Sequence, residues 1–500
     1  MFSRGKKYDP NHSSSRRGEK RLTIQRGILA AASWCDNSGV ADSTTIQARS
    51  AVLRRSFRRD FPAAVRGEGV YLWDADGKKY LDLAGSAAVN FIGHGVAEIS
   101  AAMAAQAAKL EFVHTSQFTT PVAEEYAEEL LAFAGLNSSD HFRGGAVYFT
   151  CGGSESIETA LKLARQYQVE IGQPARHQIL SRQQSYHGST LGALSVSGNR
   201  RRREIYVPMV REFAHVGMPY CYRCAFDCTD GCHNCGQQYA AELERAIEAS
   251  NGEAAAFIFE PVSGATLGAV VPPPGYLQAV AEICRRHGVL LIADEVMTGM
   301  GRTGRNFAVE HYNVAPDILI TAKGLSSGYA PLGAVIASKK VVDAIADGSG
   351  VFLHGFTYNA HPISLAAGRA VLRHLQTRKL VEAADSSRPN TSAAHFKQAL
   401  ESLRTEEVIG DVRGIGLLRA VEFVADKASK RPFPPDQNFA GSVAAAALKR
   451  GLLVYPLQGS VDGISGDHLL LAPPAIITNE QITWAAEQLR AAVHEAFVSL

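Results

Sequence analysis

The chain has 500 residues, of which 46% are hydrophobic and 20% are charged, a composition typical of a soluble globular enzyme rather than of a disordered chain. Its 51 basic and 49 acidic residues give a net charge of +2, so no basic footprint for nucleic acid stands out. No apolar run reaches the roughly 20 residues that span a bilayer, and no secretory signal is recognised. We therefore expect a cytoplasmic protein that binds neither nucleic acid nor membrane.

The first 50 residues differ from the rest in charge and polarity. Before Asp36 they contain only two acids, Asp9 and Glu19, against many Lys and Arg residues and a serine run at 13–15. Few apolar groups and an excess of one charge predict a disordered basic tail over residues 1–50. Mitochondrial transit peptides are also rich in Arg and Ser and poor in acids, so mitochondrial import is the alternative.

The segment 51–110 is expected to contain strands followed by a helix. Residues 69–81 alternate in strand fashion around an Asp-Gly turn, which predicts a β-hairpin. A loop over 86–95 and an alanine-rich helix over 99–110 follow. A further helix is expected over 121–133, because two acids fall in its first turn, where the helix dipole favours negative charge.

A glycine pair separates a predicted strand over 146–150 from a predicted helix. Apolar residues recur at i, i+3, i+4 and i+7 from Ile157, the spacing of a helix's buried face. Glycines such as Gly152 and Gly153 directly before a helix expose free backbone N–H groups, which bind anions such as phosphate. An ordinary glycine turn with Ser154 as the N-cap is the alternative.

Two short apolar runs, 289–293 and 318–320, have the length and β-branched content of buried parallel strands. Asp294 follows the first run, and Lys323 follows the second. Since the carboxyl ends of strands form the ligand crevice of an open α/β sheet, an acid and an amine are expected together there. Pyridoxal phosphate (PLP) enzymes need both groups, a lysine for the Schiff base and an acid for the ring nitrogen. Solvated strand-end charges are the alternative.

The residues around these two strands form a long motif. DEVMTGMGRTG at 294–304 and PDILITAKGLSSGYAPLGAV at 316–335 closely resemble the signature of the class III, or ω-type, aminotransferases of the fold type I PLP superfamily. The resemblance extends from about Gly67 to the C-terminus. It implies that PLP is the cofactor and that the chain transfers amino groups.

The resemblance also implies the fold, an α/β architecture with two domains. Residues 111–370 are expected to form the large PLP-binding domain, with a mostly parallel sheet flanked by helices. The smaller α+β domain draws on both chain ends, with residues 51–110 contributing from the N-terminal side and residues 371–500 from the C-terminal side.

Individual roles are implied by matching residues one by one to the family motif. Lys323 carries the cofactor and Asp294 faces its pyridine nitrogen, so these two are the expected catalytic residues. Val296 packs on the ring, and the next position, often Gln in this family, is Met297 here. The implied cofactor-binding residues are Gly153, Ser154, Tyr186, His187, Glu260, Asp294, Val296, Lys323 and Thr357.

Two further segments, which contain Tyr186, His187 and Thr357, also resemble the family. Tyr186 and His187 belong to a loop that resembles the family's YHG loop, in which the tyrosine ring stacks on the cofactor. Thr357 lies in a segment that reaches the phosphate of the neighbouring subunit in the family. The resemblance therefore implies an obligate homodimer with shared active sites.

The implied activity is a ping-pong transamination from an amino acid or ω-amine donor to a keto acid such as pyruvate. A decarboxylase, racemase or aminomutase reaction at the same site is an alternative, and a non-catalytic descendant is another. Two positions leave the donor open. Relatives that act on γ-aminobutyrate carry a second Glu where this chain has Ala265, and many ω-aminotransferases place a carboxylate-binding Arg where this chain has Tyr455.

Five of the eight cysteines fall in one short segment, at positions 221, 224, 228, 232 and 235. Paired CxxC units are typical of zinc sites, although the seven residues between Cys224 and Cys232 are fewer than common zinc ribbons contain. Reduced cysteines in a surface loop are the alternative. No catalytic metal is expected.

Overall fold

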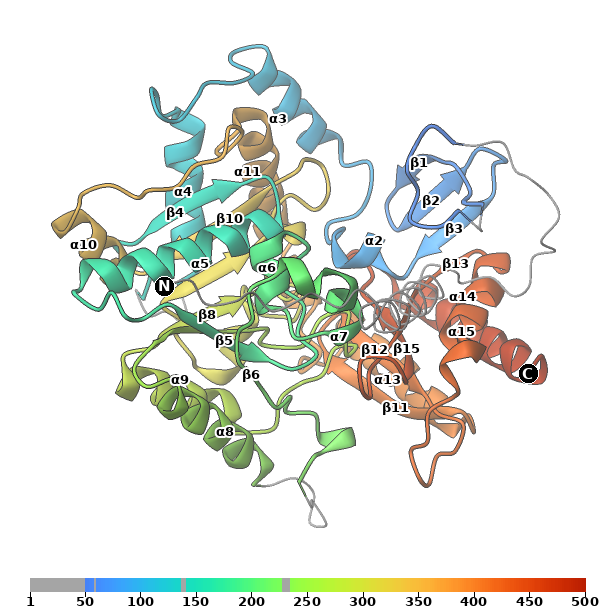
Figure 1. Ribbon diagram of the computed structural model, residues 1–500. Coiled ribbons are helices and arrows are strands. Elements are labelled where there is room, and N and C mark those ends of the chain that lie inside the picture. Colours follow the sequence, from blue (N-terminus) through green and yellow to red (C-terminus); the bar gives the residue numbers. More distant parts are fainter. Residues whose placement is uncertain (1–49, 58–59, 136–140, 227–233) are drawn as a thin grey trace, which may run out of the picture.

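The computed structural model describes residues 50–57, 60–135, 141–226 and 234–500 (Figure 1). A seven-stranded sheet forms its largest layer, in the order β4-β10-β9-β8-β7-β5-β6. Strand β10 runs antiparallel to both of its neighbours, and the other pairs are parallel. The strands are β4 (Ala146–Thr150), β5 (Gln178–Arg182), β6 (His215–Val216), β7 (Ala254–Phe259), β8 (Leu290–Asp294), β9 (Ile318–Thr321) and β10 (Gly333–Ala337). The predicted α/β fold with a mostly parallel sheet is confirmed.

The central strands are buried on both faces, which explains their continuous apolar sequences. Successive side chains of a strand point to opposite faces. Ile258 and Ile292 pack in one cluster with apolar residues of α5 (Gly153–Glu170). Phe257 and Leu291 belong to the cluster on the other face. Because each such buried side chain contributes about 1.5–3 kcal/mol, the sheet is fixed between two layers of helices.

Helices cover both faces of this sheet (Figure 1). On one face, α5 packs against α10, and on the other α8 packs against α9, while α11 packs against both α3 and α4. The helices of this part are α3 (Ala97–Ala107), α4 (Pro121–Phe133), α6 (Leu191–Val196), α7 (Arg200–Arg203), α8 (Cys235–Ala249), α9 (Tyr276–His287), α10 (Lys339–Asp347) and α11 (Pro362–Thr377).

Two smaller sheets lie beside the large one, and the first joins the two ends of the chain. Its strands have the order β1-β2-β3-β13, and β13 pairs in parallel with β3. The second sheet is antiparallel, in the order β11-β12-β15-β14. The strands are β1 (Ala64–Glu68), β2 (Tyr71–Asp74), β3 (Lys79–Asp82), β11 (Ile409–Ile415), β12 (Leu418–Phe423), β13 (Leu452–Leu453), β14 (Tyr455–Gln458) and β15 (Asp467–Leu471). The smaller α+β part therefore draws on both chain ends, as predicted.

The remaining helices connect or cover these smaller sheets. Helix α14 packs on α15 and on β14, and α13 packs on α15. These helices are α2 (Gly85–Ala88), α12 (Leu380–Ala383), α13 (Ser392–Glu401), α14 (Phe439–Lys449) and α15 (Asn479–Val498). No helix in the described part of the chain is both long enough and apolar enough to cross a bilayer.

Local predictions are confirmed with two corrections. Strands β2 and β3 pair antiparallel, which confirms the hairpin, and α4 has the predicted bounds. The helix predicted over 99–110 is α3, which begins and ends earlier than expected. The alternative with Ser154 as an N-cap is wrong, because Gly152 takes the cap position and Ser154 lies in the first turn of α5. Residues 1–49 of the tail predicted over 1–50 lie outside the described residues.

Candidate active site

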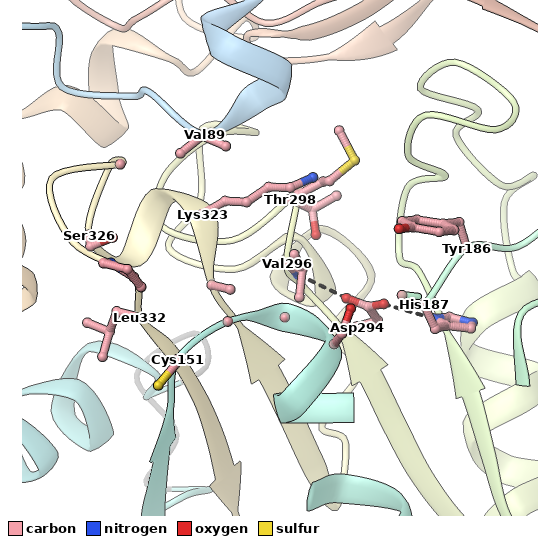
Figure 2. Close-up of a pocket in the computed structure, with 18 of the residues that line it drawn as sticks. Val89, Cys151, Tyr186, His187, Asp294, Val296, Thr298, Lys323, Ser326 and Leu332 are labelled. Carbon is pink, nitrogen blue, oxygen red and sulfur yellow. Dashed lines mark hydrogen bonds and ion pairs between the residues drawn. The ribbon is translucent and has the colours of Figure 1, made fainter. Parts of the chain in front are cut away.

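A cavity of about 490 Å³ opens at the carboxyl ends of strands β4, β5, β7, β8 and β9. Open α/β sheets bind ligands at this edge. Eight of the nine residues predicted to bind the cofactor line it, and these are Gly153, Ser154, Tyr186, His187, Glu260, Asp294, Val296 and Lys323. Figure 2 labels five of them, Tyr186, His187, Asp294, Val296 and Lys323. The structure therefore brings together side chains that lie up to 170 positions apart in sequence.

Lys323 follows β9 by two residues and extends into the cavity (Figure 2). Its backbone adopts the left-handed conformation, with a φ of 45°, which costs a residue other than glycine about 1 kcal/mol or more. The surrounding protein removes water from the amine, and this lowers its pKa from 10.5 to about 8. The carboxylate of Asp294 acts in the opposite direction, whereas the positive charge of Arg202 lowers the pKa further. The neutral form of Lys323 is therefore more populated in this site than that of a lysine in water.

Asp294 is the last residue of β8, and both of its carboxylate oxygens accept hydrogen bonds (Figure 2). His187 donates from Nδ1 to Oδ2 over 2.7 Å, and the backbone N–H of Val296 donates to Oδ1 over 3.1 Å. The imidazole of His187 is fully buried. A buried carboxylate needs such partners to stay ionised, and here they also fix its direction. Asp294 therefore presents a fixed negative group to the cavity.

The first turn of α5 borders the cavity through Gly153 and Ser154. The first amides of a helix have no acceptor within the helix, so they are available to an anion. A Cβ on Gly153 would lie 3.1 Å from the side chain of Val296. Gly188 has a φ of +139°, and a Cβ there would meet Ser154 Oγ at 2.5 Å. The absence of a side chain at these two glycines therefore lets Val296 and Ser154 approach the backbone closely. Ser154 Oγ also accepts a hydrogen bond from the N–H of Ser189.

Tyr186 and Glu260 form another side of the cavity. Glu260 follows β7 and is buried, and its Oε1 accepts from the N–H of Gly264 over 2.9 Å while its Oε2 accepts from the N–H of Tyr186 over 3.4 Å. Burial raises the pKa of Glu260, and the positive charge of Arg182 partly offsets this effect. Glu260 thus holds the backbone of the loop that carries Tyr186.

Sequence reasoning missed two buried charged residues behind the cavity, Glu295 and Arg302. Glu295 accepts from the hydroxyl of Thr298 and from the N–H of Val309, and burial raises its pKa to about 7. Arg302 is also buried and donates to the carbonyls of Ala472, Pro473 and Asn90 over 2.6–2.9 Å. Both lie inside the glycine-rich 294–304 motif. Charged residues within that motif were the sequence feature that could have identified them. They fix the loop that carries Val296 and Thr298.

The remaining lining residues are mostly small or apolar, and they come from segments that sequence reasoning described only as loops. Val89 lies directly after α2, within the loop predicted over 86–95, and Cys151 precedes the glycine pair. The hydroxyl of Tyr329 accepts from the N–H of Val96 over 2.8 Å and donates to the carbonyl of Gly93 over 3.0 Å. Tyr329 therefore joins the loop that follows Lys323 to the segment that contains Gly93 and Val96. Met297 also lines the cavity, as its position in the motif implied.

Thr357 is the one predicted residue that does not line this cavity. It is exposed and borders a separate cavity of about 660 Å³ with Tyr148, His354 and Asn359. Large apolar side chains nearby in sequence are also exposed, with Leu353 at 80% and Tyr358 at 59%. The role predicted for Thr357 in a neighbouring subunit stays a prediction.

The cysteine-rich segment lies away from the cavity. Cys221 and Cys224 are half-buried and pack on the main core, Cys235 is buried, and Tyr239 Oη lies 3.8 Å from Cys224 Sγ. Cys228 and Cys232 lie outside the described residues, so the zinc hypothesis stays a prediction.

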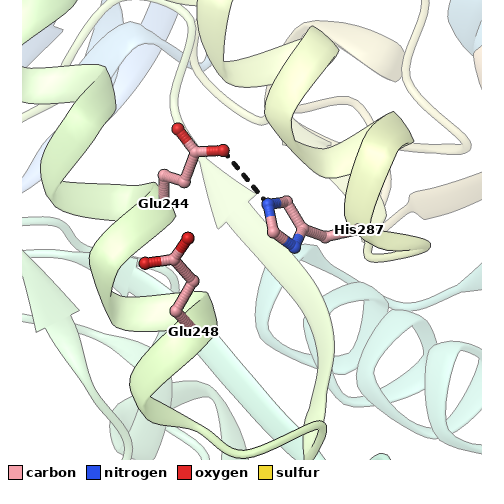
Figure 3. Close-up of side chains that lie close together, drawn as sticks. All are labelled: Glu244, Glu248 and His287. Atoms are coloured by element: carbon pink, nitrogen blue, oxygen red, sulfur yellow. Dashed lines mark hydrogen bonds and ion pairs between the residues drawn. The ribbon is translucent and has the colours of Figure 1, made fainter.

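A surface cluster on α8 and α9 also has metal-ligand chemistry (Figure 3). Ligand atoms of Glu244, Glu248 and His287 lie within 4.8 Å of one another. His287 Nε2 lies 3.1 Å from Glu244 Oε1, and the guanidinium of Arg286 lies 2.8 Å from the same oxygen. Because a cation already occupies one face of Glu244, these contacts serve to join the two helices. This cluster contributes nothing to the cavity.

The chain is similar to known proteins in both sequence and structure. A doubly covered, mostly parallel sheet with a lysine and an acid at one crevice fits the PLP-dependent transferases of fold type I. The class-III aminotransferase family matches residues 56–493. The uncharacterized aminotransferase YodT of Bacillus subtilis is 38% identical over 435 residues, which cover 87% of this chain and 95% of YodT.

Two solved structures are also similar. A thermostable (S)-enantioselective ω-transaminase from Thermomicrobium roseum is 39% identical, with a TM-score of 0.80, over 88% of this chain and 94% of that one. The ω-transaminase from Pseudomonas jessenii in complex with PMP is 30% identical, with a TM-score of 0.80, over 88% of this chain and 93% of that one. The chain belongs to the class III aminotransferases, an enzyme family that depends on PLP.

Proposed function

We propose that this aminotransferase moves an amino group from an ω-amine or amino acid donor to a keto acid such as pyruvate, with PLP as the carrier. One observation carries the proposal. Asp294 ends β8, Lys323 follows the adjacent strand β9, and both border the same cavity of about 490 Å³. The volume is within the range of cofactor sites. The Pseudomonas jessenii ω-transaminase, in complex with PMP, supports this choice of cofactor.

The groups around the cavity fit PLP by their chemistry. Lys323 offers an amine for the aldehyde, and Asp294 offers a fixed carboxylate for the ring nitrogen. The first amides of α5 and the Ser154 hydroxyl offer donors for the phosphate, and Val296 and Tyr186 would hold the ring. When bound, PLP supplies an electron sink that stabilises negative charge on the donor carbon.

Lys323 is proposed to move the proton. With a pKa of about 8, roughly a tenth of the amines are neutral at pH 7, compared with fewer than one in a thousand at the ordinary value. A neutral Nζ accepts a proton from the donor carbon as a general base and then returns it as a general acid. Burial of the amine within the protein is the main cause of its lowered pKa.

Asp294 and His187 are proposed to act as a pair. The Nδ1–H of His187 and the backbone N–H of Val296 hold the carboxylate in one orientation. Because the carboxylate is fixed before ligands arrive, it keeps a proton on the nitrogen it faces without reorganising. Nε2 of His187 is buried and has no hydrogen-bond partner among the described residues, so it is available as an acceptor.

A donor and acceptor panel tests the proposed reaction. The holoenzyme would be incubated with β-alanine, 6-aminohexanoate, hexylamine or 1-phenylethylamine, each with pyruvate, glyoxylate or 2-oxoglutarate. We expect loss of donor amine to match formation of the amino acid derived from the keto acid. Carbon dioxide release or racemisation that needs no keto acid would instead favour a decarboxylase or racemase at the same site.

We also propose that the active enzyme is a homodimer in which Thr357 completes the partner's site. The exposure of Thr357 and of the large apolar side chains Leu353 and Tyr358 supports a contact surface there. Light scattering of the purified enzyme should give twice the mass of the chain. Thr357→Ala should weaken PLP binding without dissociating the dimer, and unchanged PLP affinity would count against this role.

A further inference from the structure

A short strained segment lies beside the candidate active site. Helix α2 is a single left-handed turn, with a φ of 54° at Gly85, 49° at Ser86, 63° at Ala87 and 61° at Ala88. Residues other than glycine rarely adopt this conformation, and then as single residues, because it brings Cβ close to the following carbonyl oxygen. Three such residues in a row must therefore be held by contacts from outside the turn.

The turn leads directly to Val89, which lines the cavity together with Lys323. The backbone N–H of Val89 donates to the carbonyl of Gly85 over 2.8 Å, so the turn fixes the point at which Val89 reaches the cavity. In Figure 2, Val89 lies above the side chain of Lys323 and Asp294 lies below it. Val89 is therefore part of the wall that encloses the amine.

Arg302 links the two segments that flank this turn. Its side chain is buried, and it donates to the carbonyls of Asn90, Ala472 and Pro473 over 2.6–2.9 Å. Two of these carbonyls also border Gly85, where a Cβ would lie 2.1 Å from the oxygen of Ala472 and 3.1 Å from that of Asn90. One guanidinium therefore fixes the chain that follows α2 and the chain that follows β15.

A second attachment comes from the loop that follows Lys323. Ser327 Oγ accepts from the N–H of Phe91 over 2.8 Å and from the N–H of Ile92 over 3.1 Å. Ser327 itself has a left-handed φ of 52°, so this loop is strained where it meets the segment after α2. The loops that follow β8 and β9 therefore both hold that segment, the first through Arg302 and the second through Ser327.

We propose that Arg302 is a positioning residue that holds the left-handed turn, keeps Val89 against Lys323, and so excludes water from the amine that binds PLP. The inference rests on the proposed role of Lys323. It assigns the strain in α2 a purpose, which is to place one apolar side chain at a wall shared by three distant segments of the chain.

The electrostatics of the amine agree with this geometry. Burial is the largest cause of the lowered pKa of Lys323. Water that enters beside Val89 would weaken this effect and raise the pKa toward its ordinary value of 10.5. The charged groups that also act on the amine are Asp294 and Glu260, which raise its pKa, and Arg202 and Arg302, which lower it.

Titration of Lys323 in the full-length apoenzyme tests the inference apart from turnover. The rate at which acetic anhydride labels the Lys323 peptide is measured against pH by mass spectrometry, and its midpoint gives the pKa of the amine. Arg302→Lys keeps the charge but loses the planar fork that reaches two segments at once, and Val89→Ala removes part of the wall. We expect each variant to raise the midpoint by about half a pH unit or more. Arg302→Gln, which also removes the charge, should raise it further.

The matched control is Arg176→Lys. Arg176 also donates to three backbone carbonyls, those of Ala254, His287 and Gly288, over 2.9–3.2 Å. These acceptors lie at the amino ends of β7 and β8, at the opposite edge of the sheet from the cavity. The midpoint of this variant should equal that of the wild type even where its melting temperature falls. A wild-type midpoint in Arg302→Lys or in Val89→Ala, or an equal rise in Arg176→Lys, would overturn the inference.

A double substitution tests whether Arg302 acts through Val89. Once Val89→Ala has opened the wall, Arg302→Lys should raise the midpoint by less than half as much as it does alone, because the two changes share one effect. Fully additive shifts would contradict the positioning role. The labelling needs no PLP, so PLP found on a lysine other than Lys323 would contradict the proposed function while the titration still reports on the turn.

Discussion

The crevice around Lys323 and a second cavity of about 470 Å³ share Tyr186 but differ in the charged side chains that line them. In the crevice, Asp294 has two hydrogen-bond donors of its own, and enclosure shifts Lys323 toward its neutral form. The second cavity is lined by Arg55, Arg201 and Arg202 and by no acidic side chain of the described residues. The difference indicates that the crevice holds its charged groups in a fixed arrangement suited to a resident cofactor, whereas the described lining of the second cavity carries positive charge alone.

The largest expected effect comes from removing the amine of the crevice. Lys323→Ala should lower turnover at least about a thousandfold, because it removes the group that moves the proton. The visible absorption of lysine-linked PLP should disappear as well. Lys340→Ala, which removes an exposed lysine paired with Asp317, should retain wild-type turnover. A Lys323→Ala enzyme that stays active and yellow would contradict the account.

The next effect tests the acid of the crevice. Asp294→Asn keeps the size of the side chain but removes its charge, so kcat should fall about a hundred- to a thousandfold, as for other fixed electrostatic groups. Steady-state kinetics with a saturating keto acid measures it. Asp343→Asn, on the surface of α10, is the matched control and should leave kcat unchanged. A much smaller fall in kcat for Asp294→Asn would mean that the charge of Asp294 does not contribute to catalysis.

A glycine substitution tests the packing of Gly188 against Ser154 in the first turn of α5. Gly188→Ala should lower the free energy of unfolding by about 2 kcal/mol or more, because its left-handed φ and the 2.5 Å approach to Ser154 Oγ both penalise a Cβ. Gly252→Ala shares the positive φ but meets no atom within 4 Å, so it should cost only about 1 kcal/mol. Urea unfolding of the two holoenzymes would separate the clash from backbone strain. Equal losses would remove the steric argument.

The smallest expected effect is a shift in the pH dependence of PLP incorporation, measured for one residue of each cavity. The apoenzyme must present neutral Lys323 to bind PLP covalently, so the rate of PLP incorporation should rise from pH 6, reach half its maximum near pH 8 and level off about one pH unit higher. Since Asp294 raises the pKa of Lys323, Asp294→Asn should move the midpoint to lower pH. Arg202 lowers that pKa, so Arg202→Gln should move the midpoint to higher pH. Shifts in the same direction would contradict the assigned geometry.

The site residues that could be predicted from the sequence are those whose positions depend on neighbouring residues in the chain. Asp294, Val296 and Lys323 lie in one motif at the ends of two adjacent strands, so strand pattern and motif alone locate them. Gly153 was found by its place between a strand and a helix, although the cap itself was misplaced. Gly152 has extended backbone and caps α5, which begins one residue before Ser154.

Residues that depend on distant partners could not be predicted. Arg302 is buried because the carbonyls of Asn90 and Ala472 accept its donors, and these lie about 170 to 210 positions away in the chain. Arg202 belongs to a run of four arginines that looks like a solvated basic helix turn. Its place beside Tyr186 becomes visible only when the two segments are folded together.

The central claim is that Lys323 is the amine that holds PLP opposite Asp294. Borohydride reduction of the holoenzyme, followed by proteolysis and mass spectrometry, tests it most directly. The account predicts a single phosphopyridoxyl group, located on the peptide that contains Lys323. The same group on another lysine, or a yellow enzyme from which no labelled Lys323 peptide is recovered, would contradict the account.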